Sequence, residues 1–211
     1  MKRVTSLLPS LGILCFCPML AHAQANLDAF FGVGTAQVGS NNQQIDTFGD
    51  GTLYSTPHLG GAFGKAGGDI MLTPQFGVGG EVDFRFGQAD YAGLKYRPTF
   101  YDFNGIWMPS KFRTSRFVPE LQGGLGAVHL SFYENQQYCD QFAGCSSSSS
   151  YVEGSTHFQV HMALGVRAYL TDHIFVRPQV DVHWVNNFFQ FGSGWVPEYG
   201  ASVGYSFASR K

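Results

Sequence analysis

The sequence is short of charged residues, of cysteines and of long apolar runs. Charged residues make up 13% of the 211 residues, about half of the share in an ordinary soluble domain. Apart from one apolar run near the N-terminus, no stretch has the roughly 20 apolar residues that a membrane-spanning helix needs. The mean hydropathy is only -0.06. These absences argue against a bundle of transmembrane helices and fit a typical soluble domain poorly.

Positive charge is also scarce. The chain has 13 lysines and arginines against 15 aspartates and glutamates, a net charge of -2. No basic patch or basic helix stands out in the sequence, and such a patch is what nucleic-acid binding needs. We therefore expect no nucleic-acid partner.

The N-terminus has the organisation of a secretory signal peptide. Lys2 and Arg3 form a positive region, residues 4–20 an apolar core, and residues 21–23 an Ala-His-Ala cleavage site. This predicts a signal peptide over 1–23 and a mature domain over 24–211. Its removal leaves 11 basic residues against 15 acidic ones.

Two other interpretations of the N-terminus fit less well. A membrane helix is disfavoured by Pro9, by Pro18 and by the short apolar core. A lipoprotein signal needs a small residue before its cysteine, whereas large residues precede Cys15 and Cys17. We therefore expect export through a cleaved signal.

The stretch 156–170 (THFQVHMALGVRAYL) alternates over its whole length. From residue 158 onward its even positions are all apolar, and its odd positions are polar, small or charged. Because a strand places alternate side chains on opposite faces, one face is apolar and the other polar. The strand would be about 45 Å long, much longer than the usual 5–6 residues and long enough to cross a bilayer at a tilt.

Seven other stretches repeat the pattern with varying clarity. The eight expected strands are 27–38, 57–70, 76–86, 99–108, 117–133, 156–170, 175–186 and 195–207. Their connections alternate between long polar segments and short turns, so a meander would gather every long loop at one end. Transmembrane barrels show this asymmetry. The fold class expected is therefore all-β, an eight-stranded antiparallel up-and-down transmembrane barrel.

A soluble lipocalin-type barrel also has eight strands and one apolar face, but there the apolar side chains point inward. Small residues on the polar face suit a narrow interior. Charges of both signs on that face can neutralise one another there. Aromatic residues on the apolar face fit interfacial girdles. The expected interior polar network is Glu81, Asp83, Arg85, Asp102, Glu120, His161, Arg167, Arg177, Asp181, His183 and Glu198.

In these features the mature chain resembles the small bacterial outer-membrane β-barrels of the outer-membrane protein A/X type. The resemblance rests on the signal peptide, the amphipathic strands, a glycine-rich first strand and a final strand ending Gly204-Tyr205-Ser206-Phe207. It departs at the C-terminus, where residues 208–211 follow the final aromatic residue. It implies integration into the outer membrane, contact with lipid and lipopolysaccharide, and insertion by the barrel-assembly machinery. We expect a monomer.

Cys139 and Cys145 are the two cysteines outside the signal, and both lie in the long polar segment 134–154. An oxidising compartment and five intervening residues predict a disulfide. No C-x2-C metal spacing is present.

Three functions remain open: surface interaction through the long loops, a narrow channel, and a lipid-modifying enzyme. Loops on a rigid scaffold commonly carry recognition, which favours binding through segments 39–56 and 134–154. A polar core that fills an eight-stranded barrel disfavours conduction. The pair His129-x-Ser131 resembles lipid A deacylases, but the residues that follow differ from theirs. We expect no enzyme.

We also expect no metal and no cofactor. His161 and His183 share the inner face with Asp181, but a metal site needs three converging ligands, and a hydrogen-bonded polar core is the better explanation of these residues.

Overall fold

The computed structural model describes residues 26–38, 43–46, 49–140 and 144–208. The predicted signal peptide, residues 1–23, lies outside them. Within the described ranges, nearly all regular structure is β. No helix there is long and apolar enough to span a membrane.

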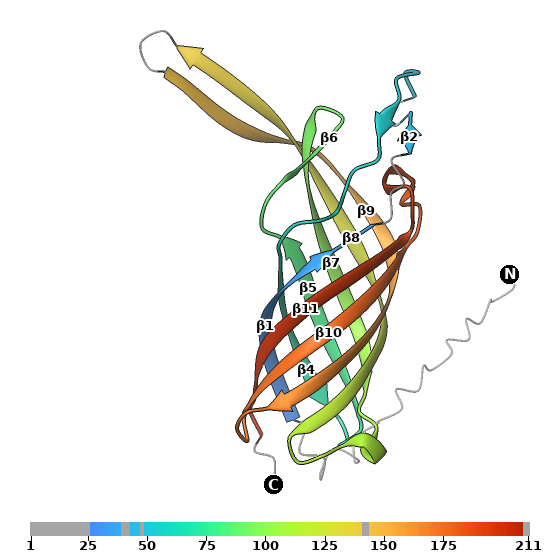
Figure 1. The fold of residues 1–211 in the computed structure, drawn as a ribbon, viewed down its shortest axis with the longest axis vertical. Helices are drawn as coiled ribbons and strands as arrows, with labels where there is room; N and C mark the ends of the chain where they lie inside the picture. Colours follow the sequence, from blue (N-terminus) through green and yellow to red (C-terminus); the bar gives the residue numbers. More distant parts are fainter. Residues whose placement is uncertain (1–25, 39–42, 47–48, 141–143, 209–211) are drawn as a thin grey trace, which may run out of the picture.

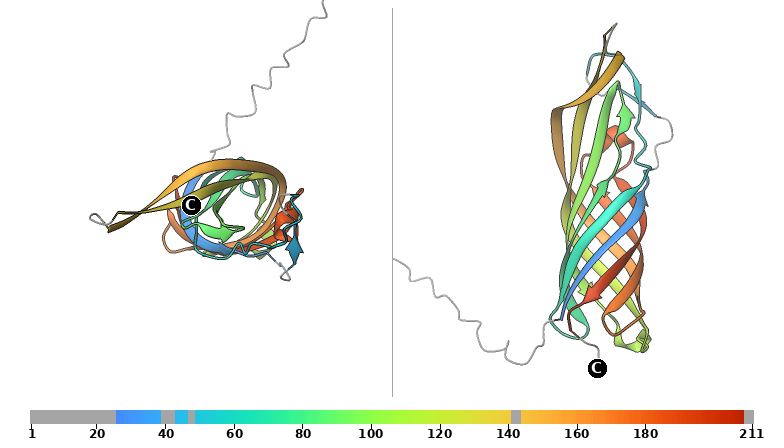
Figure 2. Two further views of the ribbon diagram at one scale, coloured as in Figure 1. Left: turned by 90° about the horizontal axis from the view of Figure 1, so that it is seen from above. Right: turned by 90° about the vertical axis from the view of Figure 1, so that its left-hand side faces the viewer.

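Eight antiparallel strands close into a barrel (Figures 1 and 2). The barrel strands are β1 (Asn26–Ala36), β4 (Phe63–Met71), β5 (Phe76–Arg85), β7 (Leu94–Trp107), β8 (Phe117–Asp140), β9 (Gly144–Tyr169), β10 (Ile174–Val185) and β11 (Trp195–Ser206). Each pairs with the next, β5 pairs with β7, and β1 pairs with β11 to complete the circle. The closed ladder confirms the predicted fold class.

The two ends of the barrel differ as predicted. One end, the short-turn end, carries the tight connections, such as the turn in which Leu170 N–H donates to Ile174 O at 2.9 Å. A 3-10 helix, η2 (Ser110–Phe112), lies in another of these connections. The opposite, long-loop end carries the small strands β2 (Gln44–Ile45), β3 (Tyr54–Ser55) and β6 (Ala89–Tyr91), and the 3-10 helix η3 (Phe189–Phe191).

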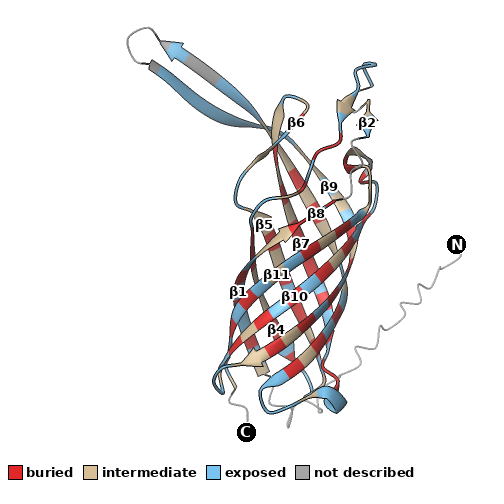
Figure 3. Cartoon of the chain, viewed as in Figure 1, coloured by how far each residue is buried: buried red, intermediate tan, exposed pale blue. Residues whose placement is uncertain are grey.

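Burial alternates along the barrel strands (Figure 3), and many of the exposed positions carry large apolar side chains. In β9, Met162 and Leu164 are 66% and 58% exposed, whereas His161 and Arg167 are almost completely buried. Six aromatic residues of the apolar face, of the kind that form interfacial girdles, are exposed as well: Trp107, Trp184, Trp195, Tyr199, Tyr205 and Phe207. The polar face therefore lines the lumen, opposite to the lipocalin arrangement.

Two strand boundaries predicted from the sequence are wrong. The second barrel strand begins at Phe63 rather than at residue 57, because Pro57 and the positive φ of Gly61 (+122°) do not suit a strand. The segment between the expected strands 76–86 and 99–108 contains β6 and the start of β7. A two-residue turn at Ala92-Gly93, both with positive φ, joins these two strands.

The segment 134–154 is a β-hairpin rather than the predicted loop. Strands β8 and β9 continue their pairing from the barrel to Cys139 and Cys145, across a register shift at Phe132/Tyr133. The hairpin projects well beyond the rest of the long-loop end and leans away from the barrel axis (Figure 1). Both of its faces are exposed to solvent, so its sequence has no alternation of apolar and polar residues that would reveal strands.

A charge on the outer face should destabilise the protein in lipid. We expect Leu164→Arg to lower the free energy of unfolding by about 2–4 kcal/mol, because arginine is costly near the middle of a bilayer. Ser148→Arg, on the exposed hairpin, is the control and should change it by less than about 0.5 kcal/mol. Urea unfolding in phospholipid vesicles measures both; equal effects would contradict an outer face in contact with lipid.

Candidate functional site

The lumen is organised around Lys65 of β4. Its Nζ lies 2.8 Å from Glu198 Oε1, 3.0 Å from Glu81 Oε1, and 3.1 Å from both Asp83 Oδ1 and Asp181 Oδ2. All five side chains are almost completely buried, and they come from β4, β5, β10 and β11. One ammonium group therefore links four carboxylates from strands that surround the lumen.

A second ionic cluster lies closer to the short-turn end. The guanidinium of Arg167 contacts carboxylates from three strands: Asp28, Asp69, whose Oδ2 is 2.6 Å from Nη2, and Glu120. Arg177 joins the two clusters, since its Nη2 lies 2.9 Å from Glu81 Oε2 and its Nη1 3.2 Å from Glu120 Oε1. Such multidentate pairing suits the planar guanidinium.

The arginine also packs on an aromatic ring. The guanidinium carbon of Arg177 lies 3.8 Å from the ring centroid of Phe30, a cation–π contact in a desolvated setting. Gly67 makes room for that ring, because a Cβ at this position would meet the Phe30 ring at 2.4 Å. The glycines on the inner face thus provide space for long side chains.

Ten of the eleven residues expected in the interior network are buried on the inner face. The exception is Arg85, which is partly exposed at the long-loop end, with its guanidinium carbon 5.9 Å from the Tyr96 ring centroid. The sequence reasoning did not include Lys65, Asp28 or Asp69. Each lies at an even number of residues from other inward-facing positions of its strand, which is the signal that could have revealed it.

Apolar side chains close the lumen on both sides of the ionic clusters. Toward the long-loop end, Phe63, Tyr96 and Phe100 pack with Leu59 and Phe191 in one buried cluster. The full set also includes Ala36, Val38, Tyr91, Val128, Leu130, Val185, Phe188 and Val196. At the short-turn end, Met71, Ile106, Met108 and Val118 form a second cluster. The charged layer is therefore enclosed between two apolar layers.

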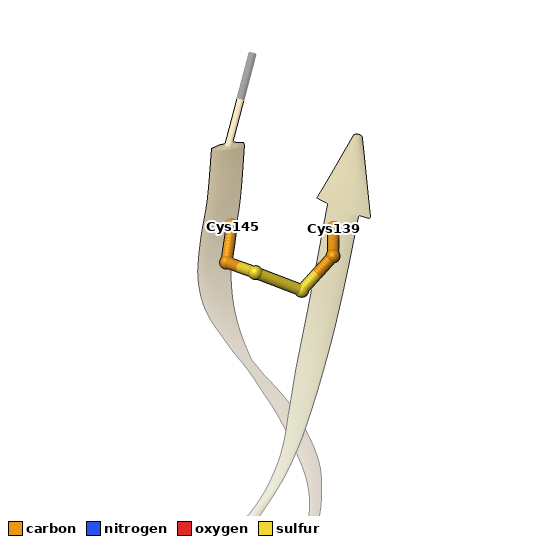
Figure 4. Close-up of a disulfide and its surroundings, with 2 residues drawn as sticks. All are labelled: Cys139 and Cys145. Atoms are coloured by element: carbon orange, nitrogen blue, oxygen red, sulfur yellow. A yellow bond between two sulfur atoms is a disulfide. The ribbon is translucent and has the colours of Figure 1, made fainter. Parts of the chain in front are cut away.

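The projecting hairpin ends in a disulfide. Cys139 and Cys145 lie directly opposite one another, with their Cα atoms 4.0 Å apart, and are joined by a disulfide bond (Figure 4). The bond links the two strands next to the hairpin tip. A shallower feature, a cleft of about 690 Å³ between the 54–61 segment and β6, lies nearer the barrel and includes Arg85 and Tyr91 in its wall.

His129 and Ser131 lie two residues apart on β8, where that strand still pairs with β7. His129 Nδ1 is hydrogen-bonded to Thr156 Oγ1 of β9 at 2.9 Å. Ser131 is paired through the backbone with Gly154. The imidazole thus contacts a threonine hydroxyl of the neighbouring strand, an arrangement that differs from a histidine activating the serine.

Known proteins with similar sequences or structures identify the family of the chain. The family model described as "Outer membrane protein beta-barrel domain" matches residues 10–207. The chain belongs to this family. Its members are outer-membrane barrels, in agreement with the resemblance seen in the sequence. A search of curated protein sequences finds no match.

Solved structures share the fold of this outer-membrane barrel at low sequence identity. A major outer membrane protein from Thermus thermophilus superposes with a TM-score of 0.55 at 12% identity, over 87% of this chain and 99% of that one. Neisserial surface protein A gives 0.51 at 14% identity, over 87% and 97%. Ail, the attachment invasion locus protein of Yersinia pestis, gives 0.51 at 10% identity, over 87% and 99%, in a complex with the heparin analogue sucrose octasulfate.

Removing the central lysine should destabilise the whole barrel. We expect Lys65→Met to lower the free energy of unfolding by about 3–5 kcal/mol, because it leaves buried carboxylates without their cation. Lys95→Met is the matched control: Lys95 pairs with the exposed Asp90, and its loss should cost about 0–1 kcal/mol. Urea unfolding in vesicles compares the two, and similar losses would show that the lumen cluster adds no more than a surface pair.

Proposed function

We propose that this outer-membrane barrel acts in surface interaction, with the β8–β9 hairpin as its main binding surface. The observation that carries the proposal is the shape of the hairpin. Its backbone pairing continues to the Cys139–Cys145 disulfide, and it projects beyond all other described parts of the long-loop end. A pre-ordered surface loses little conformational entropy on binding, and in outer-membrane barrels the longer loops are extracellular.

The contents of the lumen favour this function over a narrow channel. Three permanently charged side chains, Lys65, Arg167 and Arg177, are each held by two or more carboxylates. Apolar clusters lie on both sides of them. A conducting path would require several of these contacts to open together. A narrow channel is the alternative function. The hydrogen bond between His129 and Thr156 gives no support to a catalytic role for His129.

The sequences of the two segments 39–56 and 134–154 suggest the chemistry of the partner. Segment 134–154 contains Glu134, Asp140 and Glu153, segment 39–56 contains Asp46 and Asp50, and neither contains a lysine or an arginine. Such surfaces repel polyanions. Although Ail was solved with a sulfated heparin analogue, we propose that this chain binds a neutral or basic partner. We further propose that it is a monomer, that the barrel-assembly machinery inserts it, and that lipid and lipopolysaccharide surround it.

Shortening the hairpin should abolish binding while leaving the barrel intact. Because Glu134 pairs with Ser150, replacing residues 135–149 by Asn-Gly closes the hairpin with a two-residue turn. Nanodisc-embedded protein is tested by interferometry on neutral glycans, heparin and extracellular-matrix proteins. We expect the full chain to bind neutral or basic members and the shortened chain to bind none.

The control for that experiment is the shift in gel mobility on boiling, which reports a closed barrel in both proteins. Binding that survives the shortening would assign recognition to another loop. A full chain that binds nothing in the panel, or binds heparin alone, would contradict the proposed partner chemistry.

The disulfide should stabilise the hairpin locally and leave the barrel unchanged. For Cys139→Ser combined with Cys145→Ser, we expect faster amide hydrogen exchange in segment 134–154, because the bond contributes about 2 kcal/mol locally in the chain-entropy model. Exchange in β10 and β11 and the urea midpoint serve as the internal reference. A lowered midpoint would mean that the hairpin and the barrel unfold as one unit.

A further inference from the structure

Two histidines and an aspartate meet in the lumen, between the Lys65 cluster and the apolar layer at the long-loop end. Asp102 lies on β7, His161 on β9 and His183 on β10, and their side chains are 6%, 1% and 0% exposed. One potential ligand atom of each lies within 4.8 Å of the other two. The rings of His161 and His183 are stacked, with centroids 4.7 Å apart. Three potential metal ligands from three strands therefore lie close together.

His183 lacks the hydrogen bonds that a buried imidazole normally has. Neither of its ring nitrogens has a hydrogen-bond partner among the described residues, and neither does Asp102 Oδ2. The distance from His183 Nδ1 to Asp102 Oδ2 is 3.7 Å, too long for a hydrogen bond. Ligand atoms of a tetrahedral zinc-type ion lie about 3.3–3.6 Å apart. The gap between these two atoms suits two ligands of one cation.

Neighbouring groups hold Asp102 in position. Gln159 Nε2 donates to Asp102 Oδ1 at 2.8 Å, which leaves Oδ2 on the side of His183. On the other side, the Phe100 ring covers His183, with centroids 4.9 Å apart. A hydrogen-bonded carboxylate and a dry, aromatic cover are the surroundings that second shells of metal sites provide.

The charge of the lumen also favours a cation. Among the described residues, eight carboxylates are buried there: Asp28, Asp69, Glu81, Asp83, Asp102, Glu120, Asp181 and Glu198. In the same part of the chain, the buried lysines and arginines that oppose them are Lys65, Arg167 and Arg177. The ring nitrogens of His161 lie 2.8 Å from Asn104 Oδ1 and 3.0 Å from Asp181 Oδ1. If His161 is protonated, it adds a fourth positive charge, and the eight carboxylates still outnumber the cations.

We propose that the lumen binds a divalent transition-metal ion of the zinc type, through Asp102 Oδ2, His183 and His161. Imidazole and carboxylate ligands suit zinc and its first-row neighbours. His161 would exchange one of its two present hydrogen bonds for the metal. The ion would link β7, β9 and β10 and offset part of the negative charge. Because apolar layers enclose the site, the metal enters while the barrel folds.

The test loads the mature chain with Co²⁺ or Zn²⁺ during refolding into detergent micelles. Gel filtration with a chelator then removes weakly held metal, and the retained metal is measured. We expect about one ion per wild-type chain, and a visible cobalt spectrum of tetrahedral nitrogen and oxygen ligation. Asp102→Asn and His183→Gln should each weaken retention about 100-fold or more, and Gln159→Ala about 10-fold, as second-shell changes do.

Matched controls change the same residue types outside the lumen. Asp90→Asn and His129→Gln should retain the metal as the wild type does, and the mobility shift on boiling checks that each variant is folded. Wild-type protein that retains no metal after refolding with it would overturn the proposal, whether or not the lumen variants fold. Equal retention by wild type, Asp102→Asn and His183→Gln would overturn it as well.

Discussion

The closed backbone hydrogen-bond ladder is the constraint on which the rest of this structure depends. In hydrocarbon, an unpaired peptide group costs several kcal/mol, so a sheet in a bilayer must have no free edge. Closure through the β1–β11 and β5–β7 pairings meets this requirement. It also divides every strand into an outward and an inward row of side chains. Lipid selects apolar side chains for the outer row, and the polar residues are then confined to a narrow lumen.

Because the charged side chains are confined to a narrow lumen, their burial is costly unless their charges are compensated. Charged side chains removed from water are stable only when they are paired and hydrogen-bonded. Lys65, Arg167 and Arg177 meet this condition by contacting carboxylates from several strands at once. The same contacts connect opposite walls of the barrel. Two features of the lumen are not compensated by these contacts. The carboxylates outnumber the cationic side chains, and the ring nitrogens of His183 have no hydrogen-bond partner among the described residues.

The sequence predicted the barrel because lipid and lumen impose opposite demands on alternate residues. In β9 the alternation continues without a break from Phe158 to Tyr169. It was weak in β4, where Ala66, Gly67 and Gly68 interrupt it, and Lys65 was missed for that reason. Which carboxylates meet Lys65 depends on the relative shift of strands far apart in sequence. The amino-acid pattern of a single strand carries no information on that shift.

The sequence does not reveal the strands of the hairpin, for a different physical reason. Beyond the register shift at Phe132/Tyr133, the paired strands leave the barrel wall and have water on both faces. Their residues no longer serve the bilayer or the lumen, so hydrophobic alternation is not required of them. Substitutions, insertions and deletions there can accumulate without disturbing membrane insertion. The molecule thus combines a wall under strong sequence constraint with a module that neither the bilayer nor the lumen constrains, so the hairpin could change in sequence without changing how the barrel is built.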